Sequence, residues 1–120
     1  MAKYFSSKEF KACTPSCDIS QMDAAFLAKL DEVRALAGIP LVLNSAYRSP
    51  AYEKSKGRAG TSAHCRGMAA DIRCNSDRNR YLILRAAIRA GIDRIGIGKT
   101  FIHLDTSGAH TPCVCWHYYE

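Results

Sequence analysis

The chain has 120 residues, of which 48% are hydrophobic and 23% charged, and its net charge is +6. These values are typical of one soluble globular domain, and they exclude a disordered chain. No apolar run approaches the roughly 18 residues of a membrane span, and the scattered basic residues form no nucleic-acid-binding motif. We therefore expect a monomer with neither a membrane nor a nucleic acid as partner. The first residues, MAKYFSSKEF, contain no apolar signal core, so synthesis in the cytoplasm without a signal peptide is expected.

The first half of the chain predicts one helix, one strand and a long loop. Residues 21–37 have the spacing of an amphipathic helix, with Ser20 as N-cap and Gly38 as C-cap. Residues 41–47, LVLNSAY, predict a buried strand. Residues 48–64 are polar and contain Pro and Gly, which indicates a long loop, and such loops are usually functional or mobile.

The second half predicts short strands around a second helix. Residues 67–72, GMAADI, indicate a short strand, and Ser76 caps a helix over about 77–90. Residues 94–98 and 101–106 predict a hairpin. The side chains expected to face inward from the helix are Leu82, Ile83, Ala86, Ala87 and Ile88. We expect an α+β domain over residues 1–120, with two main helices and a small, largely antiparallel sheet.

Strand alternation brings metal-binding side chains to the less apolar face of this sheet. In FIHLDT, His103 and Asp105 share one face, and the alternate residues form the better core face. In GMAADI, Asp71 likewise lies opposite the apolar positions, and His64 ends the loop before this strand. His64, Asp71 and His103 would together leave a zinc ion one open position for water. The alternative is that these are ordinary polar residues near a sheet edge.

The stretch SAHCRGMAAD also fits a family pattern, S-x-H-x-x-G-x-A-x-D. It resembles the zinc D-alanyl-D-alanine peptidase family, which includes peptidoglycan D,D-carboxypeptidases, D,D-dipeptidases and phage endolysins, and whose fold is shared with the hedgehog signalling domain. YFSSKEF, NSAYRSPAY and RIGIGKTFIHLDT are similar to the compact branch of this family.

The resemblance implies a role for each site residue. His64, Asp71 and His103 would bind Zn²⁺, Arg48 would anchor the substrate carboxylate or polarise its carbonyl, and Ser62 would be a secondary polar contact. Many members carry an acidic residue three positions before the second histidine, where this chain has Thr100. Asp105 is therefore the expected general base, and its alternative role is to orient a ligand histidine or to pair with an arginine.

The implied activity is that of a zinc metallopeptidase, of D,D- or L,D-carboxypeptidase or endopeptidase type. It would cut D-Ala-containing stem or cross-link peptides of peptidoglycan and would act on the cell wall if released, like a phage or prophage lysin. The alternative is a non-catalytic zinc-containing binding module of the same fold, which the missing acid at Thr100 supports.

Cysteines and aromatic residues near the ends leave several alternatives open. Cys65 reads as a buried thiol or half of a disulfide, and Cys13 and Cys17 are expected to lie near one another. Cysteines at four positions could form a second zinc site, disulfides or buried free thiols; they are Cys13, Cys17, Cys113 and Cys115. Trp116, Tyr118 and Tyr119 would form a closing strand or packing cover, or line a peptide cleft. His110 would lie at the rim or stabilise an oxyanion.

Overall fold

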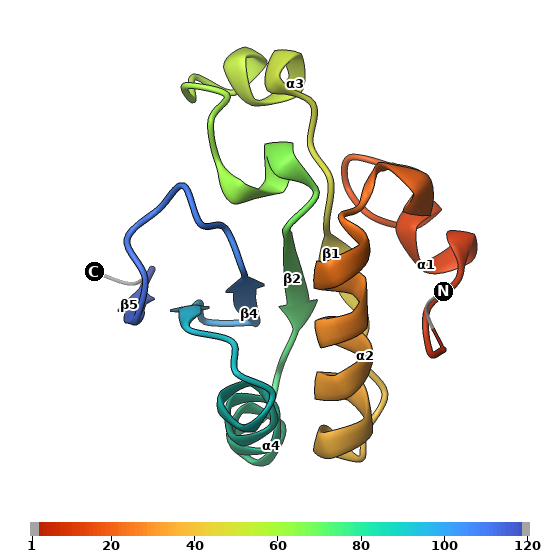
Figure 1. Ribbon diagram of the computed structural model, residues 1–120, viewed down its shortest axis with the longest axis vertical. Helices are drawn as coiled ribbons and strands as arrows, with labels where there is room; N and C mark the ends of the chain where they lie inside the picture. Colours follow the sequence, from red (N-terminus) through yellow and green to blue (C-terminus); the bar gives the residue numbers. More distant parts are fainter. Residues whose placement is uncertain (1–2, 119–120) are drawn as a thin grey trace.

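The computed structural model describes residues 3–118 of the chain, so Tyr119 lies outside the described residues. Short helices and strands alternate along the chain (Figure 1). Their order is α1 (Ser7–Lys11), η1 (Ile19–Gln21), α2 (Ala24–Ala37), β1 (Leu43–Ser45), α3 (Pro50–Ser55), η2 (Ala63–Arg66), β2 (Ala69–Arg73), α4 (Asp77–Arg89), β3 (Arg94–Ile97), β4 (Phe101–Asp105) and β5 (Val114–His117).

The five strands form one mixed sheet in the order β1-β2-β4-β3-β5. The pairs β1–β2, β2–β4 and β4–β3 are antiparallel, and the hairpin predicted for β3 and β4 is confirmed. The edge strand β5 runs parallel to β3, so the sheet is partly parallel. The α+β class is confirmed, with the parallel strand β5 as an addition to the largely antiparallel sheet that was expected.

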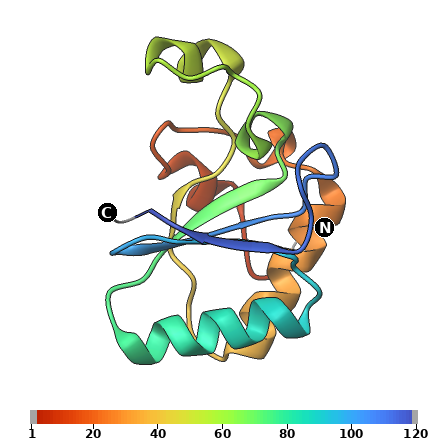
Figure 2. The same ribbon diagram turned by 90° about the vertical axis from the view of Figure 1, so that its left-hand side faces the viewer.

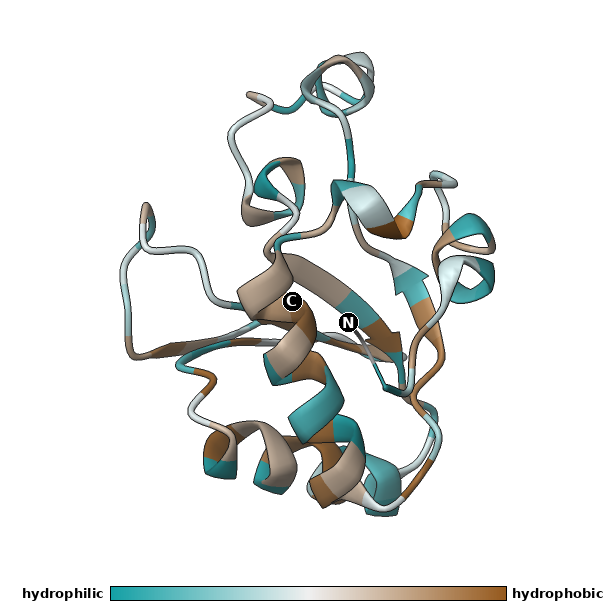
Figure 3. Cartoon of the chain, turned by 45° about the vertical axis from the view of Figure 1, so that its right-hand side comes forward, coloured by the Kyte–Doolittle hydropathy of each residue, from teal (hydrophilic) through white to brown (hydrophobic). Residues whose placement is uncertain are grey.

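The core lies between the sheet and the two long helices. Figure 2 shows α4 along one side of the sheet and α3 beyond the other side. In α2, Phe26, Leu30 and Val33 are fully buried at helical spacing, and Ile102 and Leu104 of β4 are buried in the same core. The brown colour of Figure 3 follows these buried segments, while α3 at the top is mostly teal or white. No helix among the described residues is long and apolar enough to cross a membrane.

The start of α2 differs from the expectation. Asp23, not Ser20, is its N-cap, since the Asp23 carboxylate accepts the N–H of Phe26. Ser20 instead lies within η1, a turn capped by Asp18. Asp18 and Asp23 thus cap two successive elements, η1 and α2, where the sequence predicted one continuous helix. The predicted C-cap at Gly38 is confirmed.

Two further expectations need correction. Ile88, expected to face inward, is 67% exposed. The buried residues of α4 are Ile83, Ala86 and Ala87, and Ile88 is one residue, or 100°, away from Ala87. The predicted loop 48–64 contains α3 and the start of η2, because Ser49 caps α3 and Pro50 takes its first helical position.

The six cysteines all lie within the described residues and all are free thiols. Cys13 and Cys17 lie close together, as expected, since both donate their backbone N–H to the carbonyl of Phe10. Burial, together with the neighbouring Cys17, raises the pKa of the Cys13 thiol to about 12. In residues 3–118, the cysteines considered for a second zinc site do not form a metal-binding group.

Candidate metal centre

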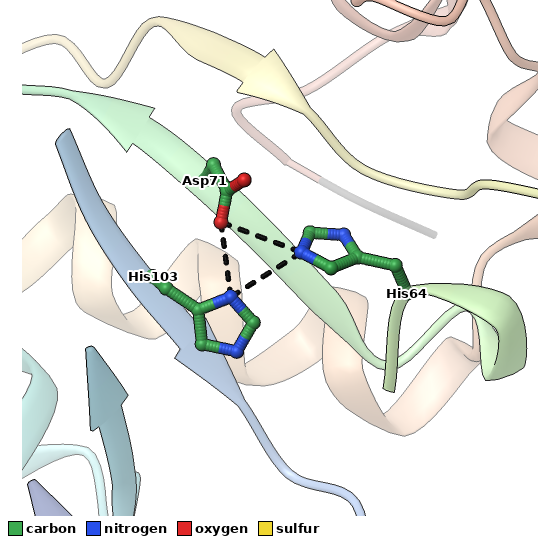
Figure 4. Close-up of side chains that lie close together, drawn as sticks. All are labelled: His64, Asp71 and His103. Atoms are coloured by element: carbon green, nitrogen blue, oxygen red, sulfur yellow. Dashed lines mark hydrogen bonds and ion pairs between the residues drawn. The ribbon is translucent and has the colours of Figure 1, made fainter. Parts of the chain in front are cut away.

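Three side chains converge on the face of the sheet opposite the core. His64 comes from η2, Asp71 from β2 and His103 from β4, and Asp71 and His103 are direct neighbours in the β2–β4 register. Figure 4 shows their side chains pointing toward one another. The His64 Nε2–His103 Nδ1, His103 Nδ1–Asp71 Oδ1 and His64 Nε2–Asp71 Oδ1 distances are 3.3, 2.9 and 3.4 Å. The facing predicted from strand alternation is confirmed for Asp71 and His103.

Gly67 lets His64 reach this point. It ends η2 with φ of 69°, a left-handed conformation that favours glycine. A Cβ atom on Gly67 would overlap the carbonyl oxygen of Gln21, and the Gly67 carbonyl accepts the N–H of Asp23 at 2.8 Å. The backbone of η2 is thereby docked on the start of α2, which fixes the position of His64 over the sheet.

The geometry of this group fits a zinc ion. Ligand atoms about 2.0–2.1 Å from a tetrahedral zinc lie about 3.3 Å from one another, close to the distances observed. His64 Nδ1 donates to the carbonyl oxygen of Ala46 at 2.6 Å, which leaves Nε2 free to face the ion. His103 Nε2 donates to Asp105 Oδ2 at 2.6 Å, which leaves the Nδ1 atom of His103 free to face the ion. Both tautomers are thus fixed in the form that metal binding requires.

The electrostatics of the group also favour a cation. Burial raises the pKa of Asp71, but hydrogen bonds from His103 and His64 outweigh it and hold this pKa well below the usual range. Burial lowers the pKa of His103, and the carboxylates of Asp105 and Asp71 more than offset this, so the net pKa is raised. A carboxylate that stays ionised beside imidazole nitrogens is a set of donors suited to a divalent cation.

Asp105 is almost completely buried, with 1% of its side chain exposed. One oxygen, Oδ2, accepts from His103, and the other, Oδ1, pairs with Arg94 Nε at 2.6 Å and accepts the N–H of Ser107 at 3.1 Å. Asp105 therefore contacts the ring nitrogen of His103 that faces away from Asp71 and His64. These contacts favour its role in orienting a histidine; the general-base role stays a prediction.

Arg48 is held by three side chains. Its Nε donates to Ser45 Oγ at 3.0 Å, its Nη1 to Glu53 Oε2 at 3.1 Å, and its Nη2 to Asp71 Oδ2 at 3.0 Å. Asp71 thus presents one oxygen to the histidines and the other to Arg48. A guanidinium has five N–H groups, so two remain for a ligand.

Glu53 was missed by the sequence reasoning because it lies in the segment expected to be a loop. It is 1% exposed, and it accepts from Arg48 and from the Cys65 thiol. Burial raises the pKa of Glu53, but hydrogen bonds from Ser62 and Arg48 outweigh this effect, so the net pKa is lowered. The Ser49–Pro50 pair was the available signal, since it marks a helix start and so places Glu53 one turn into α3.

The group opens into a cleft of about 450 Å³. Every predicted site residue lines this cleft, and so do several that the prediction did not include. The predicted site residues are Arg48, Ser62, His64, Asp71, His103 and Asp105, and His110, Trp116 and Tyr118, for which a place at the cleft was one alternative, also line it. The residues that the prediction did not include are Glu53, Arg58, Arg94 and Phe101, together with Ala63. Thr100 instead lies exposed in the turn between β3 and β4.

Two histidines and one carboxylate beside an open cleft are the ligand set of a catalytic metal site, so fold and site together indicate a metal-dependent hydrolase. The family model described as Peptidase M15 matches residues 3–105, and the chain belongs to this family of zinc-dependent metallopeptidases. The resemblance found in the sequence is thereby confirmed. No curated protein matches the chain significantly.

Proposed function

We propose that this protein is a zinc metallopeptidase that hydrolyses D-Ala-containing stem or cross-link peptides of peptidoglycan. The observation that carries the proposal is the convergence of His64 Nε2, Asp71 Oδ1 and His103 Nδ1 at the floor of a cleft. A zinc ion bound by these atoms would polarise the scissile carbonyl and lower the pKa of a water molecule. The family membership supports the peptidase class, and the substrate is our proposal.

The basic side of the cleft suits a peptide carboxylate. Arg48 keeps two N–H groups beyond those that bind Ser45, Glu53 and Asp71. Arg58 lines the same cleft, and within residues 3–118 it forms no ion pair. We propose that Arg48 binds the carboxylate or carbonyl of the substrate, with Ser62 as a further polar contact.

For proton transfer, the contacts of Asp105 favour a positioning role through His103. The other groups lining the cleft that accept a proton are Glu53 and His110, and His110 Nδ1 contacts Ser107 Oγ at 2.7 Å. In that arrangement the second ring nitrogen of His110 is left for a substrate or water. Parallel Asp105→Asn, Glu53→Gln and His110→Ala variants would show which of these side chains proton transfer requires.

The test is a digest of purified peptidoglycan analysed by mass spectrometry. We expect new amino and carboxyl ends in the stem peptides, loss of these products with EDTA, and their return with zinc. Zinc binding without any product would instead support the binding module, the alternative based on the missing acid at Thr100. We further propose that the protein meets this substrate at the cell wall, after release if it is made in the cytoplasm.

A further inference from the structure

The outer side of α4 carries a stripe of arginines. Successive residues of a helix are about 100° apart, so Arg78, Arg85 and Arg89 lie within about 40° of one another around the helix axis. The buried side chains of α4, among them Ile83 and Ala87, lie on the opposite side. Arg78 and Arg89 are exposed, and Arg85 is half-buried. We call Arg78, Arg85 and Arg89 the arginine stripe, which at about 1.5 Å per residue is about 16 Å long.

Two apolar side chains border the arginine stripe. Tyr81 and Ile88 are 60% and 67% exposed, the largest exposed fractions among the large hydrophobic residues of 3–118. They are nearly two helical turns apart, so both lie along the same edge of the stripe. The guanidinium of Arg85 lies 5.4 Å from the centre of the Tyr81 ring, at a cation–π distance. The outer side of α4 thus presents positive charge and apolar surface together.

Helix α4 concentrates the positive charge of the chain. It contains four arginines and one acidic residue, so its net charge is +3, half of the chain's net charge of +6. The one carboxylate, that of Asp77, pairs with Arg80 at 2.8 Å, outside the stripe. Within residues 3–118, the three arginines of the stripe take part in no ion pair. Because a guanidinium can bind two phosphate oxygens at once, the stripe is suited to phosphate groups.

The arginine stripe faces away from the metal centre. Helix α4 packs on the core side of the sheet, and α3 lies beyond the other side (Figure 2). His64, Asp71 and His103 converge on the face opposite the core, where the cleft opens. A flat surface that contacts the stripe therefore leaves the cleft open on the far side of the molecule.

We propose that the outer side of α4 adsorbs to the surface of an anionic phospholipid membrane. The arginine stripe contacts lipid phosphate groups, and Tyr81 and Ile88 enter the layer between the head groups and the acyl chains. A soluble phosphate polymer would offer the arginines the same partners but would leave both apolar side chains in water. The expectation that no membrane is a partner rests on the lack of an apolar span, which adsorption of a surface helix does not need.

The test measures binding of the full chain to vesicles of equal parts phosphatidylglycerol and phosphatidylcholine by co-sedimentation. One arginine near an anionic membrane contributes about 5-fold in affinity, so Arg78→Gln, Arg85→Gln and Arg89→Gln combined should weaken binding by about 100-fold. Ile88→Ser removes an inserted apolar side chain and should weaken binding by about 10-fold. Added salt should weaken binding of the unmodified protein, because it screens the charges of the stripe.

A matched variant controls for the loss of net charge. Lys8→Gln, Lys11→Gln and Lys54→Gln combined remove the same charge from exposed lysines of α1 and α3, which lie away from α4 (Figure 1). This variant should bind the vesicles nearly as tightly as the unmodified protein. Glutamine is a good helix former, so both triple variants should keep the Tm of the unmodified protein, which circular dichroism measures.

Three results would overturn the proposal. Equal weakening by the two triple variants would show that net charge, and not the stripe, drives binding. No binding to the mixed vesicles, or equal binding to vesicles of phosphatidylcholine alone, would exclude the contact with anionic lipid. Equal affinity for inorganic polyphosphate, unchanged by Ile88→Ser, would assign the stripe to a phosphate polymer instead. EDTA should leave vesicle binding unchanged, so this proposal and the zinc peptidase can fail independently.

Discussion

Replacing Asp105 with Asn separates the two roles that this residue can have. The substitution keeps the shape of the side chain but removes the negative charge that His103 Nε2 and Arg94 Nε contact at 2.6 Å each. If Asp105 orients His103, the variant should bind zinc about 10–100-fold more weakly, which is about 1.4–2.7 kcal/mol. A general base would instead leave zinc affinity unchanged and lower turnover by about 10²–10⁴-fold.

Chelator competition gives the zinc affinity, and peptide turnover is measured at rising zinc concentration. Under the orienting role, saturating zinc should restore most of the activity of Asp105→Asn. Asp77→Asn, in which a fully exposed carboxylate on α4 is neutralised, serves as the control and should match the unmodified protein. Unchanged zinc affinity together with activity that zinc cannot restore would refute our reasoning and return Asp105 to the role of base.

Three further predictions concern the metal and the thiols. His64→Ala and His103→Ala should each lower zinc content measured by mass spectrometry, and full occupancy in the double variant would rule out the site. Thiol titration should find six free thiols after denaturation without reductant, with Cys113 and Cys115 reacting first in the folded protein because they are exposed. Because the pKa of His103 is raised, its protonated form stabilises the metal-free protein below about pH 6.5, and this contribution is lost as pH rises through the folded pKa. Zinc must displace that proton, so the zinc-induced rise in Tm should be larger at pH 8 than at pH 6; an equal rise would contradict this.

The ligand set could be predicted from the sequence because it depends on local rules. Strand alternation placed His103 opposite Ile102 and Leu104, and Asp71 opposite Ala70 and Ile72, and both facings hold. The small residues around Asp71 gave the strand a face on which a histidine from η2 could approach. A period of two residues is enough to decide which side of a sheet a side chain occupies.

The surroundings of the ligands could not be predicted in the same way. The contact between Glu53 and Arg48 requires α3, a helix of six residues too short to show a helical period. The position of Trp116 requires the parallel pairing of β5 with β3, which depends on how the chain returns after residue 105. No local pattern encodes a pairing between segments so far apart, so Trp116 could be assigned to a closing strand but not placed beside His103.

Taken together, the charged groups explain why the ligands cannot be considered separately from their neighbours. A row of charged and polar side chains crosses the cleft through successive contacts, so that each buried charge has a partner. In order, the row contains Glu53, Arg48, Asp71, His103, Asp105 and Arg94. Three carboxylates and two arginines leave this row with one negative charge when the histidines are neutral, and a divalent cation would reverse it to one positive charge. With Arg58, which also lines the cleft, the charges of the lining sum to zero without the metal and to +2 with it, so an anionic peptide end should bind more tightly when zinc is bound.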